Sequence, residues 1–466
     1  MDWESNLGFG VWPFVADETM SATFQLPPTA TSTHPVWLHV GTLLDGTSTV
    51  PAKDVHVVYD ATAIRFVGRN GSTPPRELLR PGQTAPDVAA PDATLLPGLI
   101  EAHAHLFLEG GELDLEKRAA YLKQTPAGLL AAALPRLEKL VRLGITAVRD
   151  AGDKDGVGLA ISKLYKQHGS SVGPVSDRTM GQSETGPTVM PYLDSPGAAI
   201  HHRGRYGSFM GGALEDYASP AECVAARVAA GADRIKLIPT GIINFKAGAV
   251  TTEPQMTVEE LRQLVAAAGA AGRQTFAHAS GDAGIERVIE SGVDSVEHGF
   301  FVREDQLARM RDRAIAWVPT FAPVQLQLEQ AARLGWDATV VGHLQRILDG
   351  HAASLARAHA LGVLIIAGSD AGSCGVAHGL GFLRELELME RAGLPAQAVI
   401  NAATGISAGR LGFPEKIGRI EPDCRSRFIL TQNSPLAGIA NLRRAKTVVF
   451  DGQVLECSEQ PDTRGL

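Results

Sequence analysis

The feature that most constrains the fold is an alternation of short apolar segments with helical stretches through the centre of the chain. The eight segments are TLLPGLIEAH, ITAVRDAG, GPVSDRTMG, ADRIKLIPTG, RQTFAHASG, VDSVEHGF, AIAWVPTF and GVLIIAGSDAG. Strands that alternate with helices form a parallel sheet, and eight of them close into a barrel. We therefore predict an α/β fold with a (β/α)8 TIM barrel. An open, doubly wound sheet is the alternative, but no GxGxxG follows the first strand, which disfavours a dinucleotide-binding fold.

Both ends of the chain differ from its centre. Residues 36–67 hold short apolar runs separated by turn residues, VWLHVGTLL, DVHVVYD and IRFVGR, and similar runs near the C-terminus read SRFILTQ and KTVVFDGQVLE. We expect residues 36–93 and 412–466 to form one small β-sandwich domain, and residues 94–411 to form the barrel. Residues 1–35, rich in Pro, Thr and aromatic residues, are predicted to be an irregular N-terminal extension.

Composition excludes several classes of protein. Lys and Arg number 43 and Asp and Glu 51, and the resulting net charge of −8 argues against a nucleic-acid-binding protein. No run of about 18 apolar residues predicts a membrane span, and the acidic N-terminus does not resemble a secretory signal. The 4 cysteines are scattered without a CxxC pair. We expect a cytoplasmic homo-oligomer that acts on a small molecule and binds neither nucleic acid nor membrane.

Reactive side chains lie at or near the ends of the predicted strands, where barrel enzymes carry their active sites. They are His103, His105, Lys236, His278, His298 and Asp370. His103 and His105 are two residues apart, so they point to one side of a strand, where two imidazoles can chelate one metal ion. An ordinary core or surface histidine is the alternative for each of them alone. Four imidazoles and a carboxylate at one edge favour a metal centre.

Asp370 and Lys236 each have a structural alternative. Asp370 ends an apolar strand, where it would be either a helix N-cap or a metal ligand that also takes a proton from water. Lys236 stands between Ile235 and Leu237 in another strand. An ammonium inside the barrel would repel bound cations, and carboxylation of the amine would remove that conflict. A lysine that extends out of the barrel to solvent is the open alternative.

These residues carry a resemblance to a known family. The segments LLPGLIEAHAHL, GADRIKLIPTG, FAHASG, VDSVEHG and GSDAG occur in the order found in the amidohydrolase superfamily, within its imidazolonepropionase-like and Xaa-Pro dipeptidase-like branch. The resemblance implies two divalent metal ions, zinc by default, with cobalt, manganese or iron as alternatives. His103 and His105 would bind the first metal, His278 and His298 the second, and a carboxylated Lys236 would bridge them. Asp370 would bind the first metal and shuttle the proton.

The predicted activity is hydrolysis of an amide-type C–N bond by a hydroxide that bridges the metals. An amide, urea or carbamate of a small, apolar or aromatic molecule is the favoured substrate. The main alternative is an Xaa-Pro-type dipeptidase or carboxypeptidase, followed by a cyclic-amide hydrolase and a deaminase. The deaminase is disfavoured because Gly281 stands where its Glu would follow His278. A barrel protein without a metal centre is the non-catalytic alternative.

Substrate contacts are expected from the loop 182–217 and from the segment TGIINFKAG after Lys236. The candidate residues are His202, Arg203, Tyr206 and Phe245. A peptidase would need a cation for the free carboxylate of its substrate, and Arg203 or Arg205 could supply it. An apolar wall, with Phe209 and Met210, would instead favour neutral aromatic amides or ureas, the option that we prefer.

Overall fold

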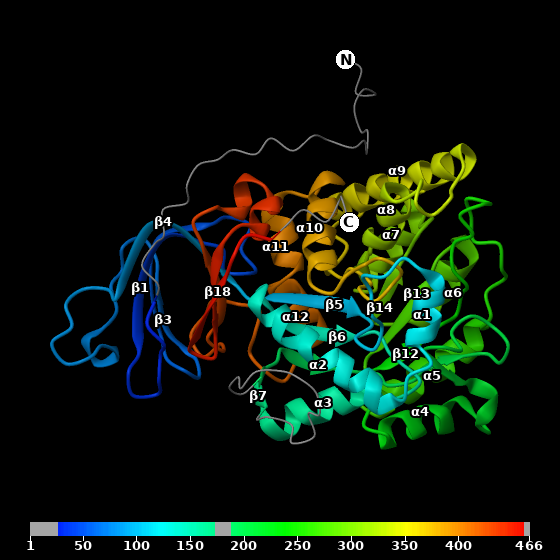
Figure 1. Ribbon diagram of the computed structural model, residues 1–466, viewed down its shortest axis with the longest axis horizontal. Coiled ribbons are helices and arrows are strands. Elements are labelled where there is room, and N and C mark those ends of the chain that lie inside the picture. Colours follow the sequence, from blue (N-terminus) through cyan, green and yellow to red (C-terminus); the bar gives the residue numbers. More distant parts are fainter. Residues whose placement is uncertain (1–26, 173–187, 461–466) are drawn as a thin grey trace, which may run out of the picture.

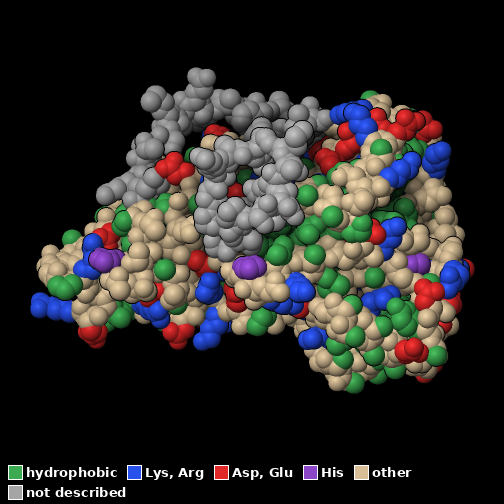
Figure 2. All heavy atoms as spheres, turned by 60° about the horizontal axis from the view of Figure 1, so that its bottom comes forward, with side chains coloured by type: hydrophobic (Ala, Val, Ile, Leu, Met, Phe, Trp, Pro, Cys, Tyr) green, Lys and Arg blue, Asp and Glu red, His purple; other side chains and the backbone are tan. Residues whose placement is uncertain are grey.

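The computed structural model describes residues 27–172 and 188–460 of the chain (Figure 1). A β-rich part, formed by both ends of the chain, lies beside a larger part of strands and helices. On the face seen in Figure 2, basic and acidic side chains are interspersed. No described helix is long and apolar enough to cross a membrane.

The β-rich part is one seven-stranded sheet in the order β18-β17-β16-β4-β1-β2-β3. Its strands are β1 Val36–Leu43, β2 Ala52–Tyr59, β3 Ile64–Gly68, β4 Val88–Pro97, β16 Arg427–Thr431, β17 Lys446–Phe450 and β18 Gln453–Cys457. Strand β4 joins the two ends of the chain, because it pairs parallel with β1 and antiparallel with β16. The expected sandwich would contain two packed sheets. In the structure, all seven strands are hydrogen-bonded into one continuous sheet.

Two parallel sheets occupy the larger part. The order β5-β6-β9 joins three strands, and β11-β10-β12-β13-β14-β15 joins six. Their bounds are β5 Leu99–Ala104, β6 Ile145–Asp150, β9 Tyr192–Asp194, β10 Ala199–His201, β11 Gly211–Ala213, β12 Ile235–Leu237, β13 Thr275–Ala279, β14 Ser295–His298 and β15 Ala316–Val318. Strands β5, β13 and β14 are buried along their whole length, which explains their continuous apolar runs. The short strands β7 Ser171–Val172 and β8 Thr188–Val189 pair separately.

Six of the eight predicted segments contain a strand of these sheets or of β4. The third segment, residues 173–181, lies outside the described residues, and β9 and β10 follow it in the chain. The eighth, residues 362–372, is not a regular strand. Single parallel bridges link it to neighbouring strands, from Ile365 to Trp317 of β15 and from Ala371 to Ala104 of β5. The prediction of a continuous eighth strand was therefore wrong, although its chain still runs between β15 and β5.

Helices separate most of the parallel strands along the chain, as the alternation predicted, although β9, β10 and β11 follow one another without a helix between them. They are α1 Leu115–Tyr121, α2 Pro126–Arg142, α3 Val157–His168, α4 Pro220–Ala229, α5 Val258–Ala270, α6 Asp282–Ser291, α7 Glu304–Asp312, α8 Ala322–Glu329, α9 Ala338–Leu361, α10 Leu380–Arg391, α11 Ala396–Ala402 and α12 Gly405–Leu411. Helix α5 illustrates how the local sequence sets a helix. A capping box of Thr257 and Glu260 begins it, and Leu261, Leu264 and Ala268 form its buried face. Such amphipathic helices cover the parallel strands and leave their carboxyl ends free for the site.

Candidate active site

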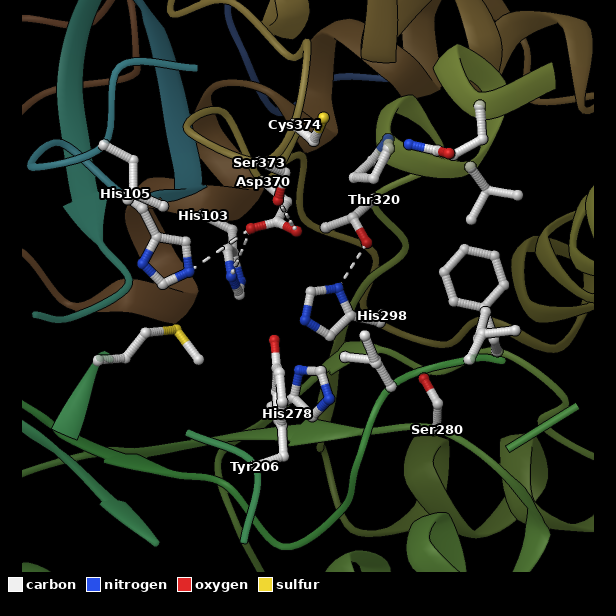
Figure 3. Close-up of a pocket in the computed structure, with 18 of the residues that line it drawn as sticks. His103, His105, Tyr206, His278, Ser280, His298, Thr320, Asp370, Ser373 and Cys374 are labelled. Atoms are coloured by element: carbon white, nitrogen blue, oxygen red, sulfur yellow. Dashed lines mark hydrogen bonds and ion pairs between the residues drawn. The ribbon is translucent and has the colours of Figure 1, made fainter. Parts of the chain in front are cut away.

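All six residues predicted as metal ligands line one pocket at the carboxyl ends of the parallel strands. The pocket has a volume of about 390 Å³. Strand β5 supplies His103 and, one residue beyond its end, His105; β12 supplies Lys236, β13 His278 and β14 His298, and Asp370 lies beside the bridge at Ala371. Figure 3 shows the histidines and Asp370 pointing toward a common space.

His103, His105 and Asp370 form the tightest group in the pocket, with ligand-type atoms within 4.8 Å of one another. Nε2 of each histidine lies 3.5 Å from Oδ1 of Asp370. Their Nδ1 atoms are already engaged, that of His103 by Glu297 at 2.6 Å and that of His105 by the carbonyl of Gly152 at 3.0 Å. Donation from Nδ1 leaves the Nε2 lone pairs free toward Asp370, as a metal ion would require.

His278 and His298 lie on the other side of the space, with ring centroids 4.6 Å apart. Nε2 of His278 donates to the carbonyl of Gly241 at 3.1 Å, which leaves its Nδ1 as the acceptor. Nδ1 of His298 is paired with the Thr320 hydroxyl at 2.7 Å, so its Nε2 is the remaining nitrogen. Burial lowers the pKa of His278 to about 3 and that of His298 well below its usual range, which keeps both rings neutral.

The Lys236 side chain points into the pocket and does not extend to solvent. Its side chain is 2% exposed, and its Nζ lies over the Phe276 ring, 4.7 Å from the centroid. Among the described residues, neither Lys236 Nζ nor His103 Nε2 has a hydrogen-bond partner, although both atoms are buried. Burial lowers the pKa of Lys236 to about 8. Buried polar atoms without partners are costly, so these two fit a group that binds between them, and a metal cluster suits a neutral imidazole and a readily deprotonated amine.

The backbone at the site is held in an unusual conformation. His298, Thr320 and Asp370 have φ angles of 69°, 52° and 57°. The left-handed region is unfavourable for non-glycine residues and especially for a β-branched one such as Thr320. Side-chain partners hold these positions: Thr320 bonds His298, and Ser373 Oγ donates to Asp370 Oδ2 at 2.7 Å. The strain is therefore concentrated where the candidate ligands turn into the pocket.

A network beneath the ligands was missed at the sequence level. Glu297, next to His298 in VEHG, accepts from Arg149 at 2.8 and 2.9 Å and from Ser295 at 2.6 Å, in addition to His103. Glu101, two residues before His103, accepts from the Ser369 backbone at 2.9 Å and hydroxyl at 2.8 Å. The available signal was an acidic residue inside an apolar strand, because a buried carboxylate needs partners.

The four substrate-binding candidates divide evenly. Tyr206 and Phe245 line the pocket, and Figure 3 shows Tyr206 directed into it. His202 and Arg203 are not among the residues that line it, so the structure does not bring them to the candidate site. Acidic neighbours draw them away: His202 lies between Glu215 at 2.7 Å and Glu260 at 3.3 Å, and the 66% exposed Arg203 side chain pairs with Asp216.

The remaining pocket wall is mainly apolar. Its apolar side chains include Phe209, Met210, Ile243, Phe245, Phe300 and Val324. Arg205, the other candidate for a carboxylate contact, borders a neighbouring cavity and donates to the carbonyl of Glu253 at 2.6 Å. The guanidinium that does line the pocket belongs to Arg118 of helix α1, a residue outside the predicted candidates. Residues 182–187 of the predicted pocket loop lie outside the described residues.

Comparison with known proteins gives a consistent result. The sequence profile of the amidohydrolase family matches residues 94–455. Ochratoxinase from Aspergillus niger is 25% identical over 428 residues, which cover 88% of this chain and 84% of that protein. A solved Xaa-Pro dipeptidase with bound methionine has a TM-score of 0.71 and 24% identity, covering 91% of this chain and all of that one. The structure of phenylurea hydrolase B has a TM-score of 0.67 and 17% identity, covering 90% of this chain and 96% of that one.

Proposed function

The chain belongs to the amidohydrolase family and is a hydrolase of carbon–nitrogen bonds, and from that premise we propose that it cleaves an amide-type bond in a small, apolar or aromatic molecule. An amide, a urea or a carbamate would meet this description. One observation carries the proposal: His103 Nε2 and Lys236 Nζ are buried without a hydrogen-bond partner among the described residues, in a pocket that also holds three further imidazoles and a carboxylate.

We assign the pocket residues to a centre of two divalent ions, with zinc as the default. His103, His105 and Asp370 would hold one ion, His278 and His298 the other, and a carboxylated Lys236 would contact both. Bound divalent ions lower the pKa of water and polarise a carbonyl oxygen. Carboxylation suits Lys236 because its lowered pKa leaves a larger fraction of neutral amine near pH 8 to react with carbon dioxide.

Asp370 is the proposed proton carrier. Burial raises its pKa to about 6, while the charges of Lys236 and Arg118 act in the opposite direction. A carboxyl group with a pKa near neutrality accepts the proton of the attacking water and returns it to the leaving nitrogen. The hydrogen bond from Ser373 to Oδ2 orients the group. The Tyr206 side chain is directed into the pocket (Figure 3), and its hydroxyl would donate to the substrate.

We further infer the architecture that carries this site. Strands β5, β6, β12, β13, β14 and β15, the broken strand formed by β9 and β10, and the bridged segment 362–372 would close one (β/α)8 barrel. Support comes from the two bridges of that segment and from the pairing of Ile200 with Leu237. The barrel would span residues 94–411, with residues 36–93 and 412–466 as the β domain and residues 1–35 as an extension.

The proposed function is tested with the metal-reconstituted enzyme. Amides, ureas, carbamates and dipeptides are incubated with protein loaded with zinc, cobalt or manganese, and release of the amine is measured. Hydrolysis of at least one class, lost in the His103→Ala variant, supports the proposal. Absence of turnover on every class with each of these metals bound would contradict it.

A second candidate is the dipeptidase or carboxypeptidase. The observation that favours it is a cation at the pocket wall, in a position that would suit a substrate carboxylate. The two candidate activities would cleave the same type of bond in the same way. They differ in the substrate, because the leaving amine of a peptidase substrate carries a negatively charged carboxylate.

A further inference from the structure

We infer that His351 and Glu385 form a clamp on the strained residue Thr320, and that through Thr320 they position the candidate ligand His298. Neither clamp residue is among those that line the pocket. The inference rests on the two-ion centre of the proposed function and adds two positioning residues to it. Its consequence is specific to one side of that centre. The second ion, which His278 and His298 would hold, should depend on the clamp, while the other ion should not.

Thr320 has a backbone conformation that its own side chain disfavours. The residue is fully buried, lines the pocket and has a φ of 52°, in the left-handed region where a β-branched residue is an outlier. Such a conformation persists only where the surrounding structure enforces it. The Thr320 hydroxyl lies 2.7 Å from Nδ1 of His298, and Figure 3 shows it directed at that ring. Relaxation of the Thr320 backbone would therefore displace a group that orients His298.

The chain is held on both sides of Thr320 by buried side chains from later helices. The carbonyl of Pro319, before it, accepts from Nε2 of His351 in α9 at 2.9 Å. The next two backbone N–H groups after Thr320 donate to the two carboxyl oxygens of Glu385 in α10, at 2.9 and 2.7 Å. His351 is 2% exposed and Glu385 is 0% exposed. The Thr320 backbone thus cannot relax without breaking a buried hydrogen bond, which is costly.

The surroundings of His351 favour this role over simple packing. Its ring stacks on Phe300, with centroids 4.0 Å apart, and also packs against Trp317 and Phe321. Burial lowers the pKa of His351 to about 4, so the ring is neutral, and its bond to a carbonyl places the proton on Nε2. Its Nδ1 is buried without a hydrogen-bond partner among the described residues, a cost that phenylalanine would avoid in the same aromatic cage. The contact to Pro319 is what a histidine adds at this position.

The same aromatic cage holds His298 from its backbone side. Trp317, which the His351 ring contacts, donates from Nε1 to the carbonyl of His298 at 2.9 Å. Gly299 allows this close approach, because a Cβ there would lie 2.5 Å from Nε1 of Trp317. Both the ring and the backbone of His298 are therefore held by residues that contact the clamp.

Two ligands of the other ion are oriented by different groups. Nδ1 of His103 pairs with Glu297 at 2.6 Å, and Nδ1 of His105 pairs with the carbonyl of Gly152 at 3.0 Å. Neither contact includes a residue of the clamp. Loss of the clamp should therefore weaken one side of the centre more than the other.

The experiment measures the two ions separately. Crystals of the full-length wild-type protein and of the variants are equilibrated with a series of buffered free zinc concentrations, and the anomalous signal gives the occupancy of each position. His351→Phe keeps the aromatic packing and removes the donor to Pro319. We expect the affinity for the second ion to fall about 10- to 100-fold, the range for groups that orient a metal ligand, with little change for the other ion. In the same crystals, the Thr320 backbone or the His298 ring should shift.

Further variants test the clamp from its other members. Glu385→Gln keeps one acceptor and places an amide NH₂ against the other backbone donor, so it should act in the same direction as His351→Phe. Thr320→Ser keeps the hydroxyl and lowers the backbone strain, so combining it with His351→Phe should restore much of the affinity for the second ion. His378→Phe is the matched control. That buried histidine, with a pKa lowered to about 4, also donates from Nε2 to a carbonyl, that of Leu108 at 2.9 Å, and its loss should leave the second ion unchanged.

Unchanged affinity for the second ion in His351→Phe, or in Glu385→Gln if the first variant does not fold, would overturn the inference. Equal loss of both ions, or the same loss in His378→Phe, would also overturn it, because either result means a general loosening of the fold. If wild-type crystals take up no second ion, the two-ion centre of the proposed function fails, and the metal-free geometry decides. A Thr320 backbone and a His298 ring that stay in place in His351→Phe would then refute the clamp, and a shift of either would support it.

Discussion

The carboxylate of Glu297 lies 2.6 Å from Nδ1 of His103, and the two residues are separated by 194 positions in the sequence. Both side chains are buried, and Arg149 holds the same carboxylate from its other side. This contact fixes the proton of His103 on Nδ1 and leaves Nε2 as an acceptor in the pocket. Glu297 is therefore placed to position a metal ligand without reaching the substrate.

The first prediction tests that role with Glu297→Gln. Glutamine has the same size but only one acceptor oxygen, so it cannot serve both His103 and Arg149 as the carboxylate does. Metal affinity should fall about 10- to 100-fold, measured by competition with a chromophoric chelator. Asp60→Asn, directly after β2 in the seven-stranded sheet, is the control and should leave the metal affinity unchanged. Wild-type affinity in a folded Glu297→Gln protein would contradict the positioning role.

The second prediction is that Lys236 is carboxylated. Growth or incubation with ¹³C-bicarbonate should give a carbamate carbon signal in NMR spectra, because the buried amine has a lowered pKa and no hydrogen-bond partner among the described residues. Lys236→Ala should lose the signal, most of the activity and part of the metal, with partial rescue by short carboxylic acids. Lys446 is the matched control: it is also buried with a lowered pKa, but its Nζ donates to the carbonyl of Leu442.

If the carbamate signal persists in Lys236→Ala and disappears in Lys446→Ala, the assignment is wrong. A third result, no signal in any variant at full metal occupancy, would leave Lys236 as a free amine and remove it from the proposed ligands.

The third prediction concerns Asp370→Asn. Asparagine tolerates the left-handed backbone at this position, where φ is 57°, so the fold should persist. Its oxygen still coordinates a metal, but the amide does not accept a proton, and kcat should fall about 10²- to 10⁴-fold. Ser373→Ala, which removes only the hydrogen bond to Oδ2, should have a smaller effect. Near-wild-type kcat in Asp370→Asn would reduce Asp370 to a ligand.

The fourth prediction is a pH dependence of stability from Glu385. This buried residue of α10 accepts from the backbone N–H of Phe321 at 2.9 Å and of Ala322 at 2.7 Å, and burial raises its pKa from 4.5 to about 8. Between these values the folded state holds a proton that the unfolded state has released. Its contribution to the free energy of unfolding is therefore present below pH 4.5 and declines as the pH rises to about 8.

Glu385→Gln should weaken this decline, because an amide does not titrate. Denaturant unfolding of both proteins at several values across that pH range measures the slope. Glu101 also has a pKa raised to about 8 by burial. Because this residue remains in the variant, part of the decline in the free energy of unfolding with pH should remain as well. Parallel curves for the two proteins would show that Glu385 does not titrate in this range.

The local pattern of apolar and polar residues determined much of the fold and the positions of the four histidines of the site. Continuous apolar runs predicted β5, β13 and β14, because strands buried on both faces need such runs. The spacing of His103 and His105 indicated that both face one side, because side chains alternate along a strand. The positions of His278 and His298 at strand ends followed from the same reasoning, and the structure brings all four into one pocket.

Only the tertiary structure decided which polar side chains meet. Arg203 and Arg118 are equivalent cations in the sequence, yet Asp216 holds the first outside the pocket and Gly372, 254 residues away, holds the second at its wall. Likewise, nothing near Glu297 in the chain points to His103. Strand and helix periods are local properties, but these partners depend on how distant elements align when parallel strands pack. Charge and periodicity thus predict what a segment forms, while packing selects which of its side chains reach the site.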